Sequence, residues 1–296
     1  MAQASALKTY DSVGNREDLT DYIGLITRDE TPLYSSLEKV KAYARTHEWQ
    51  TDSLSTGSAN AQIEGADFSF AIPSARSRVS NNTQIFSKTL EVSETQNVVS
   101  VAGLDEEFAY QMDKRMREIA TDIEKALITG TGNSGASGTA RELKGALAFI
   151  ATNVETGTGT GNETLTESMY NNALQTIWAA GGRPDTTYVN GGQKRKISGF
   201  TSNNTRFLSV SENTELVNSV SVYESDFGKQ RIELDPFMDT DKVMLLQKDM
   251  WKVAVLRGLK PVDVAKVADS KRGAIVTELT LEARNEKSSG KITQLS

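Results

Sequence analysis

Polar and apolar side chains alternate along residues 86–95. The polar positions fall on one parity: Ser87, Thr89, Glu91, Ser93 and Thr95. The opposite parity carries Phe86, Leu90 and Val92, with Lys88 as the exception between them. Because successive side chains of a strand point to opposite faces, the alternation predicts a strand with one face in water.

This strand lies near the end of a longer polar segment, residues 47–101, which is rich in Ser, Thr, Asn and Gln. Trp49 and its neighbours could form the opposing arm, and Gly57, Gly65 and Pro73 interrupt the middle. We therefore predict a long two-stranded hairpin with a mobile tip. An isolated two-stranded ribbon is marginally stable in water, so the rest of the domain or a neighbouring subunit has to support it.

The strongest helical pattern covers residues 104–129. Its apolar stripe repeats every three or four residues: Leu104, Phe108, Met112, Met116, Ile119, Ile123 and Leu127. Two pairs of opposite charge have the spacing of i, i+4 contacts on the other faces: Asp113–Arg117 and Lys114–Glu118. The spacing predicts a helix about 37 Å long that ends at Gly130.

Two short helices are predicted ahead of the hairpin. The first follows an amphipathic stripe: Leu19, Tyr22, Ile23 and Ile26. The second begins at Thr31-Pro32, a capping residue followed by proline at the first helical position. Its buried side would carry Leu33, Leu37 and Val40.

Helical and strand-like segments alternate in the C-terminal half. Thr164 and Glu167 have the spacing of a capping box, and Gly181-Gly182 would end the helix behind it. A strand at 187–190 and a helix at 193–200 follow, so a separate compact α/β subdomain is predicted. Strand-like segments then return at residues 243–246, 251–256, 262–267 and 275–281.

Composition narrows the class of protein. The 296 residues carry a net charge of −6, which argues against a dedicated nucleic-acid binder, because such proteins neutralise phosphates with a basic surface. The chain has no cysteine. This excludes disulfides, zinc ribbons, iron–sulfur clusters and thiol nucleophiles. The single histidine, His47, leaves no His-based metal cluster. With no apolar run of about 18 residues and no signal-peptide core, we expect no membrane contact and a cytoplasmic origin.

Three local motifs are candidates for chemistry. Gly130-x-Gly132-x-x-Gly135 matches the dinucleotide-binding string, but it follows a helix and precedes a loop, so a flexible linker is the simpler interpretation. His47 could act as a general base, yet a half-exposed residue at the root of the hairpin is favoured. The only tight basic cluster is a weak candidate for DNA contact, which a solvated helix end also explains: Lys194, Arg195 and Lys196.

Acidic side chains are numerous, but none stands in a recognisable catalytic frame. Examples are Glu64, Asp67, Asp105 and Glu106. Counting carboxylates therefore leaves a two-carboxylate hydrolase open, although solvated surfaces are the favoured explanation of these residues. No cofactor and no metal site is predicted.

The predicted elements follow one another as a short arm, two small helices, a polar hairpin, a long helix, a glycine-broken region, an α/β subdomain and returning strands. Four strings accompany this order: Val13–Leu19 with Thr31–Leu33, Glu48–Leu54, Asn82–Phe86 and Asp122–Leu127. The order of the predicted elements and these four sequence strings together resemble the major capsid proteins of tailed bacteriophages, which have the Hong Kong 97-type fold. One departure is Leu33, where an aromatic residue would be expected.

The resemblance implies an α+β Hong Kong 97-type capsid fold with four parts. Residues 1–14 would be the N-terminal arm, 47–101 an extended β-hairpin called the extension loop, and 164–235 the axial α/β domain. The peripheral domain would be discontinuous and contain the long spine helix at about 104–129. Its segments would be residues 15–46, 102–163 and 236–296.

The same resemblance implies a structural subunit and no enzyme. It would self-assemble as hexamers and pentamers into the icosahedral shell of a virion, formed in the host cytoplasm around double-stranded DNA. A separate scaffolding protein and a portal are implied, and a decoration protein is a further candidate partner. The candidate inter-subunit contacts are Arg16, Trp49, Glu64, Asp67, Phe68, Phe70, Arg76 and Arg78.

Five-fold and six-fold environments would require small adjustments of one backbone. We expect the arm, the hairpin and the glycine-rich segment 130–138 to absorb them. Two alternatives remain open. One is a bacterial nanocompartment shell protein, which has a similar architecture but encloses protein cargo. The other is a carboxylate-based hydrolase with the hairpin as a lid.

Overall fold

The computed structural model of the protein describes residues 29–55, 57–65, 67, 70, 72–73, 75–99, 106–157, 163–200, 221–266 and 268–296. The predicted arm and the first predicted helix lie outside the described residues. So do two of the candidate contact residues, Arg16 and Phe68.

The longest strands form a four-stranded sheet in the order β1-β12-β13-β4. β1 (Glu38–Lys41) runs parallel to β12 (Trp251–Asp263). β13 (Ser270–Ala283) pairs antiparallel with both β12 and β4 (Gln84–Ser93), so that β4 and β1 are the two edge strands. The separate strand predicted at residues 262–267 is wrong, because β12 runs on to Asp263 and the turn into β13 follows.

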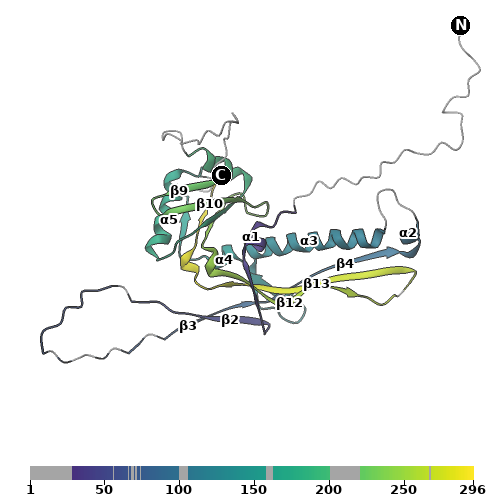
Figure 1. The fold of residues 1–296 in the computed structure, drawn as a ribbon, viewed down its shortest axis with the longest axis horizontal. Coiled ribbons are helices and arrows are strands. Elements are labelled where there is room, and N and C mark those ends of the chain that lie inside the picture. Colours follow the sequence, from purple (N-terminus) through teal and green to yellow (C-terminus); the bar gives the residue numbers. More distant parts are fainter. Residues whose placement is uncertain are drawn as a thin grey trace, which may run out of the picture.

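The long helix α3 (Glu107–Thr129) lies along this sheet (Figure 1). Its predicted end before Gly130 is confirmed, and so is the stripe from Phe108 onward, whereas Leu104 lies outside the described residues. The stripe residues Ile119, Ile123 and Leu127 are buried in one core with sheet residues such as Phe86 and Ile275. The long helix and the long strands therefore stabilise each other through this shared apolar layer.

The charged groups on α3 follow the expected spacing in part. Arg117 pairs with Asp113 as predicted, at 3.1 Å. The predicted Lys114–Glu118 pair is wrong, because Glu118 pairs with Arg115 at 2.6 Å.

Lys88 breaks the alternation of β4 for a reason that the sequence does not reveal. Its Nζ lies 2.8 Å from the Oδ2 atom of Asp122 on α3, and the ion pair bridges strand and helix. A lysine can therefore sit on the packed side of β4, because its charge meets a carboxylate there.

The hairpin is shorter than predicted. β2 (Thr46–Thr51) pairs antiparallel with β3 (Ser77–Asn82), and Trp49 lies opposite Val79. The predicted pairing of the Trp49 segment with residues 86–95 is wrong, because that strand is β4 and belongs to the four-stranded sheet. A period of two indicates a half-buried strand but does not specify its partner. Residues 94–98 form a short helix, α2 (Glu94–Val98).

Short elements connect the hairpin, the helix and the sheets. The second predicted helix is α1 (Pro32–Ser36); Leu33 and Leu37 are buried as expected, whereas Val40 belongs to β1 and is half-buried. The glycine motif forms a strand and turns instead of a nucleotide-binding loop, with no helix directly after it. The remaining connecting elements are β5 (Thr131–Asn133), β6 (Glu142–Lys144), α4 (Ala146–Phe149), η2 (Lys248–Met250) and η3 (Glu286–Ser288).

A second sheet has six strands in the order β7-β14-β11-β8-β10-β9. Helices α5 (Glu167–Ala179) and α6 (Gly191–Ser198) accompany it, and apolar residues of both helices share a core with the sheet. Three of its strands come from outside residues 164–235: β7 (Val154–Thr156), β11 (Val243–Leu246) and β14 (Gly290–Thr293). The other three are β8 (Thr186–Val189), β9 (Val222–Ser225) and β10 (Gly228–Leu234).

The start of α5 differs from the sequence prediction. The N-cap is Thr166, whose hydroxyl accepts a hydrogen bond from the Met169 amide at 3.3 Å. The predicted capping box at Thr164 is therefore wrong by two residues. Within the described parts of the chain, no helix is long and apolar enough to span a bilayer.

Candidate assembly interface

The root of the hairpin is fastened to strand β13. The Trp49 indole Nε1 donates to the Ala283 carbonyl at 2.7 Å. His47 Nε2 lies 2.9 Å from the Glu282 carboxylate. Burial would raise the pKa of Glu282, but hydrogen bonds from Arg284 and His47 lower it overall. His47 is therefore an attachment point of the hairpin, as the favoured interpretation expected.

Asn81 forms a second attachment from the other strand of the hairpin. Its buried amide donates to the carbonyls of Leu281, at 2.8 Å, and Lys144, at 3.0 Å. Its Oδ1 accepts from the Lys144 amide at 2.8 Å. One side chain thus joins β3 to both β6 and β13.

Glu278 forms the third attachment, just beyond β3. Its carboxylate is almost fully buried, accepts from the Thr83 hydroxyl at 2.8 Å and from Arg257 Nε at 2.9 Å, and pairs with Arg141. Arg141 Nε also donates to the Thr83 carbonyl at 2.7 Å. A buried carboxylate with this many donors is satisfied, and its charge would be left uncompensated only if both arginines were removed.

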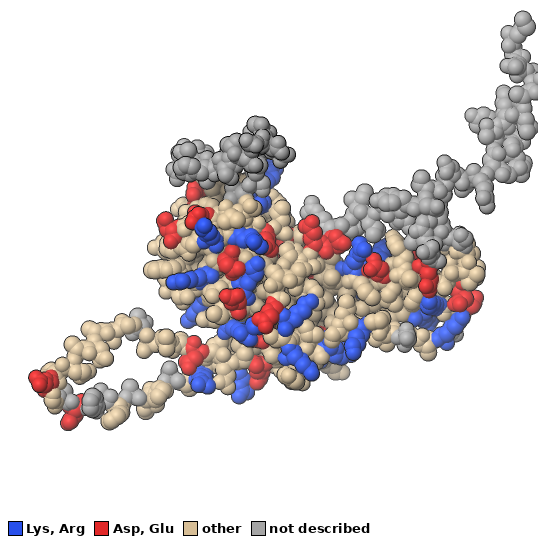
Figure 2. Space-filling model, viewed as in Figure 1, with Lys and Arg blue, Asp and Glu red and all other residues tan. Residues whose placement is uncertain are grey.

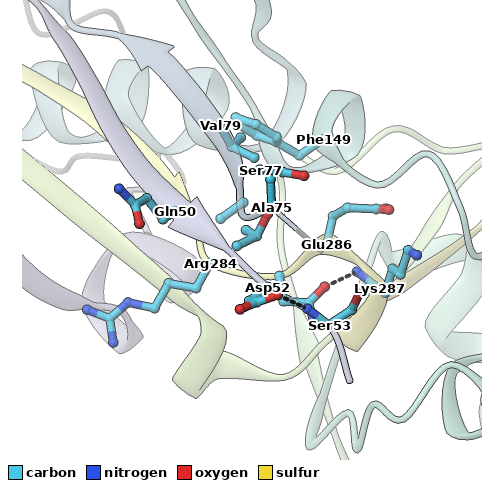
Figure 3. A pocket seen from close by; sticks show the side chains of 13 residues that line it. Gln50, Asp52, Ser53, Ala75, Ser77, Val79, Phe149, Arg284, Glu286 and Lys287 are labelled. Carbon is cyan, nitrogen blue, oxygen red and sulfur yellow. Dashed lines mark hydrogen bonds between the residues drawn. The ribbon is translucent and has the colours of Figure 1, made fainter. Parts of the chain in front are cut away.

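A hollow of about 480 Å³ separates the hairpin from the body next to this root (Figure 3). One side is lined by hairpin residues, including Asp52, and the other by the segment 283–287. Asp52 accepts from the Ser53 amide at 2.9 Å, and Glu286 accepts from the amides of Ala151 and Thr152 at 3.1 and 3.2 Å. Both carboxylates already have partners, so the hollow presents no ready acid–base pair.

The outer half of the hairpin, residues 52–76, differs from its root. Strand pairing ends at Thr51 opposite Ser77, and the described residues beyond that point form no strand. Four large apolar side chains there are strongly exposed: Leu54 at 99%, Phe70 at 95%, Ile72 at 95% and Ile63 at 83%. Burial of such a side chain contributes roughly 1.5–3 kcal/mol, so a partner surface that covered these residues would bind favourably.

The candidate contact residues fall on two parts of the hairpin. Glu64, Asp67 and Phe70 are exposed in the outer half, and Figure 2 shows acidic side chains at its far end. Arg76 and Arg78 lie nearer the root, where they face Asp52 at 3.7 Å and Glu48 at 3.3 Å.

Trp49 belongs to the root. It is half-buried, and its ring lies 6.0 Å from that of Phe149 in the core beneath α3. Its position within its own subunit leaves only part of its surface for a contact between subunits.

The basic cluster does not form one charged surface. All three residues lie on α6, but their side chains differ in their contacts and in their exposure to solvent. Lys194 Nζ donates to the Ile232 carbonyl at 3.2 Å, and burial lowers its pKa. Lys196 hydrogen-bonds Ser296, and Arg195 is exposed.

One buried group escaped the sequence analysis. Glu124 is fully buried on α3, and its two carboxylate oxygens accept from the amides of Leu33 and Tyr34, both at 2.7 Å. Burial, together with the neighbouring Asp235, raises its pKa to about 8. The available signal was a glutamate beside Ile123 in the apolar stripe, but its partners lie 90 residues away.

The sequence model of the SU10 major capsid protein family matches residues 6–296. The chain belongs to this family. Among curated proteins, the major capsid protein of Escherichia phage Phieco32 is 25% identical over 98% of this chain and 97% of its own length. This capsid subunit is therefore a shell-forming structural protein of a phage, as the resemblance implied.

Solved structures confirm the Hong Kong 97-type fold. The capsid asymmetric unit of cyanophage A-1(L) matches with a TM-score of 0.74 at 13% identity, over 98% of both chains. The holo-SrpI encapsulin complex of Synechococcus elongatus PCC 7942 matches less well, with a TM-score of 0.57 at 10% identity, over 96% of this chain and 93% of that one. The same fold thus occurs in phage capsids and in an encapsulin.

Proposed function

We propose that the subunit assembles as hexamers and pentamers into a closed icosahedral capsid, in which each hairpin rests on an adjacent copy. The observation that carries this proposal is the contrast within the hairpin. Its root is fixed by buried hydrogen bonds, whereas its outer half exposes Leu54, Phe70 and Ile72. A neighbouring subunit is the surface that would cover these side chains.

Elementary energetics supports a shell made from such contacts. Each contact between two copies is weak, but a subunit that touches several neighbours gains stability through multivalency. A contact that uses two different surfaces of the subunit repeats around a rotation axis and closes into a ring. Small differences between five-fold and six-fold rings would be absorbed by the hairpin, the arm and the segment 130–138.

We propose double-stranded DNA as the content of the shell. The net charge of −6 favours an inner surface on which packaged DNA can slide, with non-specific contact at scattered basic groups such as Arg195. Assembly in the host cytoplasm would use a separate scaffolding protein and a portal, and a decoration protein is a further candidate. The subunit would act without catalysis or a cofactor.

The nanocompartment alternative is supported by fold alone, through the encapsulin match. The two functions differ in the content of the particle. Purified particles that hold double-stranded DNA support the capsid, whereas particles that hold an enzyme and no DNA support the nanocompartment. The hydrolase alternative has weaker support, because the chain belongs to a family of capsid proteins.

The hairpin test replaces the three most exposed of these apolar side chains together: Leu54→Ser, Phe70→Ser and Ile72→Ser. We expect the free subunit to keep its fold and its circular dichroism spectrum, while the yield of shells seen by electron microscopy falls at least about tenfold, as the loss of a few kcal/mol per contact requires. The matched control keeps the positions apolar, with Leu54→Met, Phe70→Leu and Ile72→Val. Normal shell yield from the serine variant would contradict the proposal.

A further inference from the structure

Two buried carboxyl groups meet at the junction between the long helix and the six-stranded sheet. Glu124 lies on α3, and Asp235 directly follows β10; both side chains are buried. The two carboxyl groups lie within hydrogen-bond reach of each other, and neither forms an ion pair with a lysine or arginine of the described residues. Two carboxylates in contact inside a protein repel each other, so ionisation of both is costly.

The hydrogen bonds of the pair leave one oxygen without a donor. Both oxygens of Glu124 accept backbone amides of α1, from Leu33 and Tyr34. Asp235 Oδ1 accepts from the Phe237 amide at 2.8 Å, whereas the buried Asp235 Oδ2 has no donor among the described residues. Such an orphaned oxygen is costly. A proton on Glu124 supplies the donor, because a protonated carboxyl group donates one O–H and still accepts hydrogen bonds.

The charged groups around the pair do not provide a cation for it. Lys248 Nζ faces the Glu233 carboxylate at 3.9 Å, and Lys39 Nζ lies 4.3 Å from the centroid of the Tyr34 ring. Burial raises the pKa of the neighbouring Tyr188 hydroxyl, so this tyrosine stays uncharged. The titratable and charged groups of the surrounding elements are Tyr34 and Lys39 of the α1–β1 segment, Tyr188 of β8, Asp185 just before β8, Glu233 of β10, Lys248 of η2 and the exposed Lys125 of α3. A proton is therefore the remaining way to balance the pair.

We propose that Glu124 and Asp235 share one proton, and that this proton joins the long helix to the six-stranded sheet. The position of Asp235 supports the assignment. Ile232 of β10 is buried in the core of the six-stranded sheet, whereas Phe237 and Met238, just beyond Asp235, pack in the core beneath α3. Figure 1 shows the six-stranded sheet beside the end of α3 that carries Glu124. The carboxyl pair thus lies where the chain passes from one core to the other.

Loss of the proton acts on the Asp235 side of the pair. A carboxylate accepts the α1 amides at least as well as a protonated carboxyl group does, so α1 keeps its place on α3. The contact with Asp235 instead becomes a contact between two negative charges. Because burial and the neighbouring Asp235 raise the pKa of Glu124 to about 8, the joint is closed at neutral pH and opens as pH rises through this value.

Infrared difference spectroscopy of the full-length free subunit detects the proton directly, because a protonated carboxyl group and a carboxylate absorb at different frequencies. At about pH 6, ordinary aspartate and glutamate side chains are ionised. We expect the unmodified subunit to show a protonated carboxyl band at that pH and to lose it with a midpoint near pH 8. The absence of this band would overturn the inference without the need for any variant.

The Asp235→Asn variant tests whether Asp235 shares the proton. Its amide oxygen still accepts from Phe237, and its N–H group donates to an ionised Glu124. We therefore expect the protonated carboxyl band to disappear while the joint stays closed. Asp249→Asn is the matched control, because Asp249 is exposed, and it should keep the band. A band that survives in Asp235→Asn overturns the assignment.

Nuclear magnetic resonance of isotope-labelled methionine methyl groups measures the opening of the joint. Met238 lies just beyond Asp235, and Met169 in the other core is the reference. We expect the Met238 signal of the unmodified subunit to shift with a midpoint near pH 8, and to stay constant in Asp235→Asn. The Met169 signal should stay constant in both proteins. A Met238 signal that does not respond to pH contradicts the claim that the proton joins helix and sheet.

Discussion

Glu124 links three elements through one carboxyl group. It lies on α3, accepts the first free amides of α1, and neighbours Asp235 at the end of β10. Pro32 has no amide hydrogen, so Leu33 and Tyr34 carry the donors that this helix start has to satisfy. At the residue scale, a single buried acid therefore positions α1 against the long helix.

Protonation of Glu124 makes stability depend on pH. Its pKa is raised from 4.5 to about 8, so the folded chain holds a proton that the unfolded chain releases. The contribution of Glu124 to the free energy of unfolding should be full below pH 4.5 and should fall, by up to about 1.4 kcal/mol per pH unit, as pH rises toward 8. Urea unfolding of the free subunit across this range measures the slope.

The Glu124→Gln variant removes this titration, and we expect a flatter pH profile. Burial also raises the pKa of Asp235, so part of the slope remains. Glu118→Gln on the same helix is the matched control, because this glutamate is partly exposed. Equal slopes in both variants would contradict the assigned role of Glu124.

Asn81 shows how much one buried amide contributes to the hairpin root. Asn81→Ala removes hydrogen bonds to β6 and β13 and leaves the Leu281 and Lys144 carbonyls without this donor. We expect a loss of about 2–4 kcal/mol in the free energy of unfolding. Thermal or urea unfolding measures it, with Asn60→Ala in the exposed outer half as the control. A loss as small as that of the control would show that the root is held by other contacts.

The end of α3 shows what a sequence pattern can define at the scale of an element. The apolar stripe predicted the helix, and Gly130 predicted its end. The structure adds the reason for glycine: a Cβ at this position would lie 2.5 Å from the Leu143 carbonyl oxygen and 2.6 Å from that of Ala126. The close approach of β6 to the helix end, and not a left-handed backbone, requires the glycine.

A Gly130→Ala variant should therefore be destabilised. The added methyl group meets backbone atoms that cannot move independently, so we expect a loss of about 1–3 kcal/mol in the free energy of unfolding. Gly191→Ala is the matched control, since a Cβ added at Gly191 would meet nothing within 4 Å and the backbone there is unstrained. Similar stability of the two variants would contradict the packing at Gly130.

Strand pairing was the part of each element that the sequence could not predict. The alternation along 86–95 identified a half-buried strand, yet its partner is β13, almost 200 residues away. Lys88 appeared as an exception because Asp122 belongs to a different element. Local periodicity reports how a segment is buried, whereas pairing depends on contacts between distant segments.

At the scale of the whole molecule, the four-stranded and six-stranded sheets each contain strands that lie far apart in the sequence. The six-stranded sheet takes β7, β11 and β14 from both sides of residues 164–235. No local pattern could assign these short strands to that sheet. The fold class, in contrast, came from the resemblance to tailed-phage capsid proteins, which the order of elements and the four short strings carried together.

The candidate interface was predictable in part. Its polar, glycine-interrupted sequence indicated a hairpin with little core of its own, and exposed residues such as Phe70 and Asp67 fit that interpretation. The role of Trp49 differs from a simple contact residue, because its indole fastens the hairpin to Ala283. A tryptophan in a polar segment can pack inward or outward, and only the position of β13 decides between them.

Cryo-electron microscopy of the assembled shell would show whether a neighbouring copy supports the outer half of the hairpin. We expect residues 52–76 to lie on an adjacent subunit and Leu54, Phe70 and Ile72 to be mostly buried there. A shell in which the hairpin folds back over its own subunit, or leaves these side chains in solvent, would contradict it.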